Sequence, residues 1–387
     1  MGCMFARPAW RGLVAASHGG APIVWLTGVR RAGKTTLVQS LPGAVVLNCD
    51  LPSTAERLRD PERFLAGVEQ PLVVFDEIHQ LADPSRVLKI AAYTRPDLRV
   101  VATGSSTLAA PAKFRDTLTG RKRVVHLLPV LAEELRAFQV TSLERRLLHG
   151  GLPPALLADA PPADFYAEWM DSFYARDVQE LFRVEKRRGF LLLLETLLRN
   201  SSGLTEMTNL ARITGLSRPT VASYLDVLEI THAVAVLRPY HRGGNAELTH
   251  QPKVYGFDTG FVAWSHGWSE LHASERGLLW EHLVLDTLRS VSPDVPVQFW
   301  RDKQQREVDF VVPRGRGACD AFECKWTADA FDPAGLRAMR ALHPMGRNYL
   351  VAPIVGEPYE WSWGNVTLRV VNATHLRAEL GAVPSSG

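Results

Sequence analysis

The sequence has few cysteines, no long apolar run and almost no excess of either charge. Its four cysteines among 387 residues have no zinc-type spacing and predict no disulfide framework, so we expect free thiols in a reducing compartment. The densest apolar run, residues 190–194, ends at Glu195, far short of the roughly 18 residues that indicate a membrane span. We therefore expect a cytoplasmic protein without a signal peptide or a membrane partner.

Charge, composition and length limit the class of protein and the number of domains. The net charge of +3 does not by itself indicate nucleic acid, although residues 121–123 and 186–188 are local basic clusters. A hydrophobic content of 46% and a charged content of 22% are typical of a globular protein. The length of 387 residues is enough for two or three domains with their own cores.

A short run near the start, Gly28-Val29-Arg30-Arg31-Ala32-Gly33-Lys34-Thr35, fits the phosphate-binding pattern G-x-x-x-x-G-K-S/T. In this pattern the glycines let the backbone wrap a phosphate, the lysine neutralises it and the hydroxyl can hold Mg²⁺. An apolar strand at 22–27 precedes the run, and a helix whose free N–H groups suit a triphosphate follows it. We expect ATP and Mg²⁺ as cofactors, bound by Gly28, Arg31, Ala32, Gly33, Lys34, Thr35 and Thr36.

Short apolar strands are expected at 44–48, 72–75, 98–103 and 123–127, separated by helical stretches. Buried, non-alternating strands of this kind predict an α/β domain with a parallel sheet covered on both faces. One strand ends in Asp76-Glu77. Together with the phosphate loop, this pair predicts that Asp76 lies beside the Mg²⁺ and that Glu77 is catalytic, polarising the attacking water. The alternative is an acidic pair in a solvated turn.

Two further residues extend the expected ATP site. The strand at 98–103 runs into Thr103-Gly104-Ser105-Ser106, which places Ser105 to sense the γ-phosphate, although such a run is also ordinary turn chemistry. Arg121 is a candidate catalytic arginine finger supplied by a neighbouring subunit, and the alternative for it is a surface basic cluster. An arginine that acts in trans requires a homo-oligomer.

These segments together resemble a prokaryotic AAA-type P-loop ATPase family whose members carry a C-terminal domain of unknown function, number 4143. The resemblance rests on Gly28–Thr35, Val73–His79, Thr103–Ser106 and Leu118–Arg121. It implies an ATPase core with the catalytic acid at Glu77 and a sensor at Ser105 or Ser106. His79 stands where the family usually has Gln, a difference outside the phosphate chemistry.

The middle of the chain predicts a helix-turn-helix between residues 204 and 228. A first helix at 207–213 precedes Gly215, which permits the turn, and Ser217 can cap the second helix. We expect the second helix to expose Arg218, Thr220, Ser223 and Tyr224 toward a groove. Residues 233–240 with a turn at 242–245 extend this to a winged helix, a shape that serves either DNA or protein contacts.

The last third carries a second group of charged residues. Glu281 lies on an amphipathic helix, and a turn between strands at 307–312 and 321–326 is expected to place Asp309 beside Glu323, with Lys325 on the same face. Such a group predicts Mg²⁺ bound by the three carboxylates and a catalytic Lys325 that orients water. The Asp…Glu-x-Lys pattern resembles the restriction-endonuclease-like fold over about residues 270–350. The alternative is a salt bridge across one face of a sheet.

We divide the chain into an AAA-type ATPase domain at 1–150, a helical linker and winged-helix region at 151–250, and a restriction-endonuclease-like α/β domain at 251–387. In the linker, Arg176 next to Asp177 contacts nucleotide or, as such pairs more often do, is structural. The sequence predicts an ATP-hydrolysing protein that acts on DNA through a nuclease-like domain. The alternative is a nucleotide-switched interaction module whose nuclease-like domain is catalytically dead.

Overall fold

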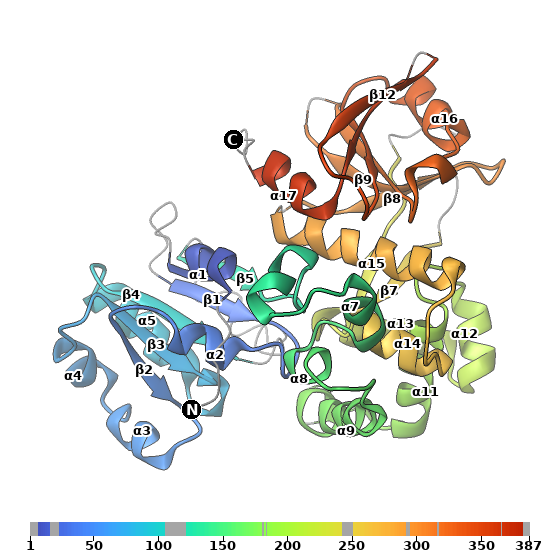
Figure 1. Ribbon diagram of the computed structural model, residues 1–387. Coiled ribbons are helices and arrows are strands. Elements are labelled where there is room, and N and C mark those ends of the chain that lie inside the picture. The colour runs from blue at the N-terminus through green and yellow to red at the C-terminus, as the bar shows by residue number, and fades with distance from the viewer. Residues whose placement is uncertain are drawn as a thin grey trace.

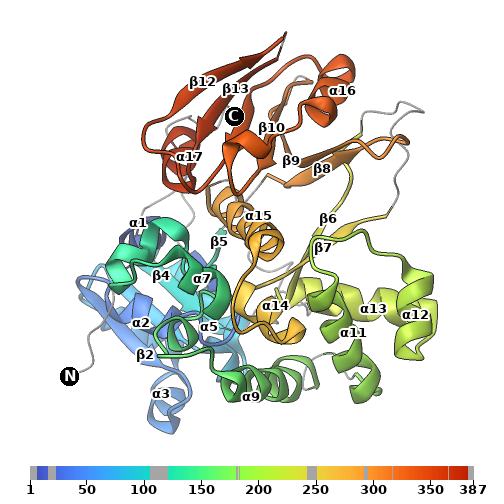
Figure 2. The ribbon, with the colours of Figure 1, turned by 45° about the vertical axis from the view of Figure 1, so that its right-hand side comes forward.

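The computed structural model describes residues 7–15, 23–104, 121–179, 182, 184–241, 251–291, 295–315, 317–364 and 366–381. Along the chain they form a first α/β part, a mainly helical middle part and a second α/β part (Figure 1). Both views place the long helix α15 (Ala273–Val291) between the last sheet and the rest of the molecule (Figure 2). Among these described residues, no helix is both long and apolar enough to cross a membrane.

The first part is built on a sheet of five short strands. These are β1 (Ile23–Thr27), β2 (Ala44–Asn48), β3 (Leu72–Asp76), β4 (Arg99–Thr103) and β5 (Lys122–His126). All neighbours run parallel, in the order β2-β3-β4-β1-β5, so the predicted parallel α/β sheet is confirmed. Because every residue of β1 and β3 is buried, each strand begins with four successive apolar residues before its polar last residue.

Helices cover both faces of this sheet. Side chains alternate along β1, so that Leu26 joins one hydrophobic cluster and Trp25 the other. Residues of α1 (Pro8–Ala15) and α2 (Lys34–Gln39) pack in the first cluster, and residues of α4 (Pro61–Ala66) and α5 (Pro84–Thr94) pack in the second. The short helices α3 (Pro52–Arg57) and η1 (Ile78–Gln80) follow β2 and β3. Because β3, β4 and β1 are parallel neighbours, their carboxyl ends lie side by side at one end of the sheet, which we call its open edge.

The middle part is mainly helical. Its helices are η3 (Ala132–Phe138), α7 (Leu143–His149), α8 (Pro153–Leu156), α9 (Ala163–Phe173), the π-helical η4 (Tyr174–Gln179), α11 (Arg187–Arg199), α12 (Met207–Thr214), α13 (Arg218–Ile230) and α14 (Thr259–His266). Between α12 and α13 the chain turns at Gly215, whose φ is +67°. Ser217 then caps α13, accepting the Thr220 N–H over 3.3 Å. Both features agree with the predicted helix-turn-helix.

The expectation that Tyr224 is exposed on α13 is wrong. Its side chain is buried, its ring packs edge-on against Phe190 with centroids 5.3 Å apart, and its hydroxyl accepts the Lys186 N–H. The physical reason is helical spacing, because Tyr224 lies three residues after the buried Val221 and shares its face. By contrast, Ser223 is exposed.

A two-stranded ribbon follows α13. β6 (Val234–Leu237) pairs antiparallel with β7 (Lys253–Gly256). The turn expected at 242–245 lies outside the described residues. Just after β6, Pro239 forms a bridge with Phe299 of the last sheet, so the ribbon connects the middle part to the second α/β part.

The second α/β part is a six-stranded mixed sheet. Its elements after α15 are β8 (Gln298–Arg301), β9 (Glu307–Pro313), β10 (Cys319–Cys324), η5 (Ala328–Ala330), α16 (Ala334–Leu342), β11 (Asn348–Val351), β12 (Tyr359–Trp363), β13 (Val366–Val371) and α17 (Ala373–Gly381). The order is β12-β13-β11-β10-β9-β8. β8, β9 and β10 are antiparallel, whereas β10, β11 and β13 are parallel. The register pairs Phe310 with Phe322, which makes Asp309 and Glu323 neighbours.

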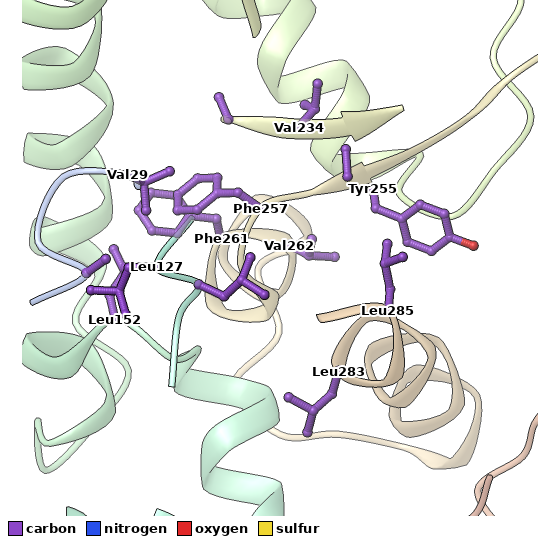
Figure 3. Packing of buried hydrophobic residues seen from close by; sticks show 14 of the residues in the cluster. Val29, Leu127, Leu152, Val234, Tyr255, Phe257, Phe261, Val262, Leu283 and Leu285 are labelled. Atoms are coloured by element: carbon purple, nitrogen blue, oxygen red, sulfur yellow. The ribbon is translucent and has the colours of Figure 1, made fainter. Parts of the chain in front are cut away.

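One large hydrophobic cluster runs through all three parts. Figure 3 shows a part of it, with Val29, Phe257 and Phe261 close together and Tyr255 and Leu285 on the right of the view. Trp169 of α9 packs in the same cluster.

Trp169 makes several ring contacts there. It stacks on Phe257 with centroids 4.6 Å apart and on Phe173 at 5.0 Å, and it meets Phe261 edge-on. This tryptophan, 1% exposed, joins α9 to the residues that follow β7.

We expect Trp169→Ala to destabilise the protein by about 3–5 kcal/mol, because removing a buried aromatic ring loses its burial and leaves a cavity. Urea denaturation followed by circular dichroism measures the change. Trp363→Ala is the matched control, since this ring on β12 is 39% exposed, and we expect it to cost less than about 1 kcal/mol. Equal losses in the two variants would contradict the role assigned to Trp169.

Candidate functional site

The phosphate loop joins β1 to α2 at the open edge of the first sheet. Gly28 has a φ of +148°, and a Cβ there would lie 2.6 Å from the Leu127 carbonyl oxygen, so the close approach requires glycine. Lys34 Nζ donates to the carbonyl oxygens of Gly28, over 2.8 Å, and Val29, over 3.2 Å. Burial lowers the Lys34 pKa, although Glu77, Asp177 and Asp76 oppose the shift. The loop thus holds a buried ammonium that an anion would stabilise.

A cavity of about 550 Å³ opens over this loop, a size that suits a small-molecule ligand. Arg31, Ala32, Gly33, Lys34, Thr35 and Thr36, all predicted as binding residues, line it. Gly28 does not line the cavity, but its carbonyl oxygen accepts a hydrogen bond from Lys34. Arg31 has a φ of +63° and pairs with Glu168 over 2.7 Å. Six of the seven predicted cofactor-binding residues of the loop therefore surround one space.

The acidic pair Asp76-Glu77 follows β3 at the same edge. The Thr103 hydroxyl at the end of β4 donates to Asp76 Oδ1 over 2.6 Å and accepts the Glu77 N–H over 2.9 Å. Glu77 has a φ of +54° and lines the cavity. Its Oε2 lies 3.2 Å from His79 Nδ1, although the two are not aligned for a hydrogen bond. Thr103 fixes both acids because β4 lies between β3 and β1.

Two further residues were predicted for this site, and the described one, Arg121, is not among the residues that line the cavity. Ser105 lies outside the described residues. Arg121 precedes β5, and its carbonyl accepts the N–H of Ile23, the first residue of β1. It therefore lies at the end of the sheet opposite the phosphate loop. Its guanidinium packs over the Tyr93 ring, 4.1 Å from the centroid.

Sequence reasoning missed the residues that the middle part adds to the cavity. Asp177 of η4 pairs with Arg30 of the loop, Nε to Oδ2 over 2.5 Å, and lines the cavity. Burial raises the Asp177 pKa, while Arg30 and Lys34 oppose the shift. Arg176, the residue considered in the sequence, is instead exposed. The only signal for Asp177 was its place in that Arg-Asp pair.

Other elements of the middle part complete the wall of the cavity. Pro153, Pro154 and Leu157 lie in and after α8, and Phe138 ends η3. These apolar side chains face the charged loop across the space. No local pattern in the sequence marks them, because their role depends on how the middle part packs on the sheet.

The second group of predicted residues also comes together in the structure. Lys325 Nζ lies 3.1 Å from Glu323 Oε2 and 3.4 Å from Asp309 Oδ2, and the Cys324 N–H donates to Asp309 Oδ2 over 2.7 Å. Burial and, after it, the nearby Asp309 raise the Glu323 pKa to about 8, although Lys325 opposes the shift. Burial alone would lower the Lys325 pKa, but the negative charges of Asp309 and Glu323 outweigh this effect and raise the pKa. The other predicted residue, Glu281, lies near Asp309, whose charge acts on it.

Glu281 is held by residues that the sequence did not point to. The Tyr255 hydroxyl donates to Glu281 Oε1 over 2.5 Å, and Lys253 Nζ lies 3.8 Å from the same oxygen. Lys253 also pairs with Glu307, which Arg301 contacts over 2.6 Å. Burial raises the Glu281 pKa to about 7, against the pull of Lys253. We call these residues (Lys253, Tyr255, Glu281, Glu307, Asp309, Glu323 and Lys325) the charged cluster.

The donor set of the charged cluster fits a hard divalent cation, because carboxylate oxygens are the ligands Mg²⁺ takes. Glu323 Oε1 is buried without a hydrogen-bond partner, so one oxygen remains available. Within the described ranges, however, no three His, Cys, Asp or Glu side chains already lie close enough to share one ion. In this arrangement lysines, rather than a preformed ligand cage, neutralise the carboxylates.

Three family models match successive segments of the chain. Residues 20–136 match a model described as AAA domain, residues 140–272 match a domain of unknown function (DUF8612), and residues 276–358 match a domain of unknown function (DUF4143). The phosphate loop and Asp76-Glu77 lie in the first segment, and Glu281, Asp309 and Glu323 lie in the third. The chain thus has an AAA-type P-loop ATPase domain and a DUF4143 C-terminal domain, as the sequence resemblance implied.

Similar solved structures include three chains that share little sequence identity with this one. The Saccharomyces cerevisiae Hsp104–ADP complex is 18% identical, with a TM-score of 0.28 over 57% of this chain and 38% of that chain. A DNA polymerase III gamma subunit-related protein of Thermotoga maritima is 12% identical, with a TM-score of 0.25 over 57% and 97% of the two chains. Caenorhabditis elegans PCH-2 is 13% identical, with a TM-score of 0.24 over 53% and 62%. Scores this low carry no argument about this chain.

Two curated relatives match most of the chain. They are the uncharacterized proteins Mb2031c of Mycobacterium bovis and Rv2008c of Mycobacterium tuberculosis, each 31% identical over a 336-residue match that covers 83% of this chain and 73% of the relative. The match extends well beyond the ATPase domain, since that domain's model covers only residues 20–136. The chain belongs to the same family as these two mycobacterial proteins, with an AAA-type P-loop ATPase domain followed by a DUF4143 domain.

Proposed function

We propose that this protein binds ATP at the phosphate loop and hydrolyses it with Mg²⁺. The observation that carries the proposal is the meeting of the buried Lys34 with Asp76 and Glu77 at one sheet edge, where Thr103 bonds to both acids. Lys34 binds the phosphates, and Thr35 and Asp76 are the residues that would hold the Mg²⁺, which supplies charge neutralisation at the phosphates.

Glu77 is the proposed catalytic base. Its backbone is fixed by Thr103, and its side chain, 29% exposed, reaches the cavity. A carboxylate in this position accepts the proton of the attacking water and orients that water toward the γ-phosphate. Ser105 is the proposed sensor of that phosphate.

Arg121 is the proposed arginine finger, and it acts in trans. It lies at the end of β1 opposite the phosphate loop of its own chain, so only a neighbouring copy can receive it. A homo-oligomer is therefore part of the proposal.

The rest of the chain is proposed to act on DNA. The exposed Arg218 and Ser223 on α13, beside the β6–β7 ribbon, support a winged helix that meets a groove. The α15 helix with the β8–β11 sheet, and the contacts of Lys325 with Asp309 and Glu323, support a restriction-endonuclease-like domain. In that domain Glu281, Asp309 and Glu323 would hold Mg²⁺, and Lys325 would orient the attacking water.

A second candidate function is a nucleotide-switched interaction module with a catalytically dead nuclease-like domain. The observation that favours it is the neutralisation of the carboxylates by Lys253 and Lys325. A site filled by ammonium groups does not need a metal ion to be stable. A cleavage assay separates the two candidates.

We expect Glu77→Gln to lower ATP turnover by about 10²–10³-fold while leaving ATP affinity nearly unchanged, because the amide cannot accept the proton of water. Steady-state phosphate release and binding of a fluorescent ATP analogue measure the two quantities. Glu62→Gln, an exposed change on α4, is the control. Undiminished turnover in Glu77→Gln would remove Glu77 from its proposed role.

We expect Asp177→Asn to tighten binding of a non-hydrolysable ATP analogue by about 3–10-fold. The carboxylate pairs with Arg30 and faces the phosphate cavity, so neutralising it frees the guanidinium and removes a repulsion. Fluorescence anisotropy titration measures the affinity. Asp171→Asn breaks an exposed pair with Arg187 nearby and should have no effect. Weaker binding in Asp177→Asn would show that the carboxylate supports nucleotide binding.

We expect Mg²⁺- or Mn²⁺-dependent cleavage in an assay on linear, single-stranded and branched DNA, with and without ATP. Asp309→Ala and Glu323→Ala should each abolish cleavage, because both carboxylates belong to the proposed metal site. Glu360→Ala, an exposed change on β12, should leave it intact. Absence of cleavage in every condition would favour the dead-domain candidate.

A further inference from the structure

Lys253 lies inside the charged cluster although it comes from another part of the chain. It is the first residue of β7, in the ribbon that follows α13. Its side chain is buried, and its ammonium pairs with Glu307 and lies 3.8 Å from Glu281 Oε1. The only other lysine of the cluster, Lys325, contacts Asp309 and Glu323 instead. Lys253 thus neutralises Glu281 and Glu307, the two carboxylates that Lys325 does not contact.

Without Lys253, one of its two carboxylate partners would keep a cationic neighbour and the other would not. Glu307 would keep Arg301, which contacts its other oxygen over 2.6 Å. Glu281 would keep only the neutral Tyr255 hydroxyl among its described contacts. Because a buried carboxylate without a cation is costly, Glu281 would then attract a replacement positive charge. Glu323 Oε1, buried and without a hydrogen-bond partner, marks a second ligand atom available to such an ion.

We propose that Lys253 is a built-in cation that competes with a divalent metal ion for Glu281, so that the charged cluster binds metal tightly only when this lysine withdraws. The inference rests on the metal site of the proposed function and adds its regulation. Lys253 is a positioning residue, since it acts through Glu281. Its strand belongs to the middle part, which also contacts the phosphate loop through Trp169 and Asp177.

Mn²⁺ binding to the full-length chain without nucleotide tests the proposal, with free Mn²⁺ followed by electron paramagnetic resonance. The binding component that Glu323→Gln removes is the one that belongs to the cluster. We expect Lys253→Met and Lys253→Gln to tighten this component by about tenfold, because each removes the competing charge. Lys253→Arg should keep the weak wild-type affinity.

The control is Lys303→Met, which removes an exposed positive charge from the same domain and should change nothing. Loss of folding cannot mimic a gain of affinity, and circular dichroism checks each variant. If both neutral variants bind Mn²⁺ no more tightly than the wild type, Lys253 is not a competitor, even though the metal site stands. If Glu323→Gln removes no Mn²⁺ binding from any variant, the metal site itself is absent, and both the proposed function of this domain and the inference fall.

Discussion

The hydrogen bond from the Trp169 indole to the Arg30 carbonyl, 3.1 Å long, fixes the phosphate loop on the middle part of the chain, and the same ring packs on Phe257 next to β7. The same stretch of chain reaches the loop twice more, where Glu168 pairs with Arg31 and Asp177 pairs with Arg30. A glycine-containing loop is flexible when it stands alone. Here one helix and its π-helical extension hold it in place.

The ring of Trp169 also connects the middle part to the strand β7. It stacks on Phe257, which follows directly after β7, and β7 delivers Lys253 and Tyr255 to Glu281. The nucleotide cavity and the charged cluster are therefore attached to opposite ends of one short strand and its flanking residues. This arrangement is a physical connection between the two sites.

Burial of charge is the second constraint, because an isolated buried ion costs several kcal/mol. At the first site the buried Lys34 and the nearby Arg30 and Arg31 make a space suited to a phosphate chain. At the second site the surplus is negative, and Lys253 and Lys325 offset it. The first site therefore suits an anionic ligand, whereas at the second, under the proposed function, a metal ion would have to replace a lysine.

The sequence predicted what local chemistry determines. The phosphate loop, Asp76-Glu77 and the parallel sheet follow from a contiguous motif and from buried strands, and the resemblance to an AAA-type family with domain 4143 is confirmed by the family matches. The close approach of Asp309 to Glu323 and Lys325 followed from strand alternation.

What the sequence did not predict depends on packing between distant segments. Asp177 and Lys253 reach their sites only because the middle part folds against both α/β parts, and no pattern near either residue records this. Thr103 was seen as part of a turn, yet its position between β3 and β1 makes it the partner of both acids. Tyr224 was predicted to be exposed because its hydroxyl is polar. Its spacing from Val221, however, is that of a residue on the buried face of the helix.

The most direct test of the central claim is phosphate release from ATP by the purified full-length chain in the presence of Mg²⁺, compared with that of Lys34→Ala. We predict steady turnover by the wild type and loss of both ATP binding and turnover in the variant, because the buried ammonium that meets the phosphates is gone. Nucleotide binding and turnover that are unchanged in Lys34→Ala would contradict the assignment of the phosphate loop as the ATP site.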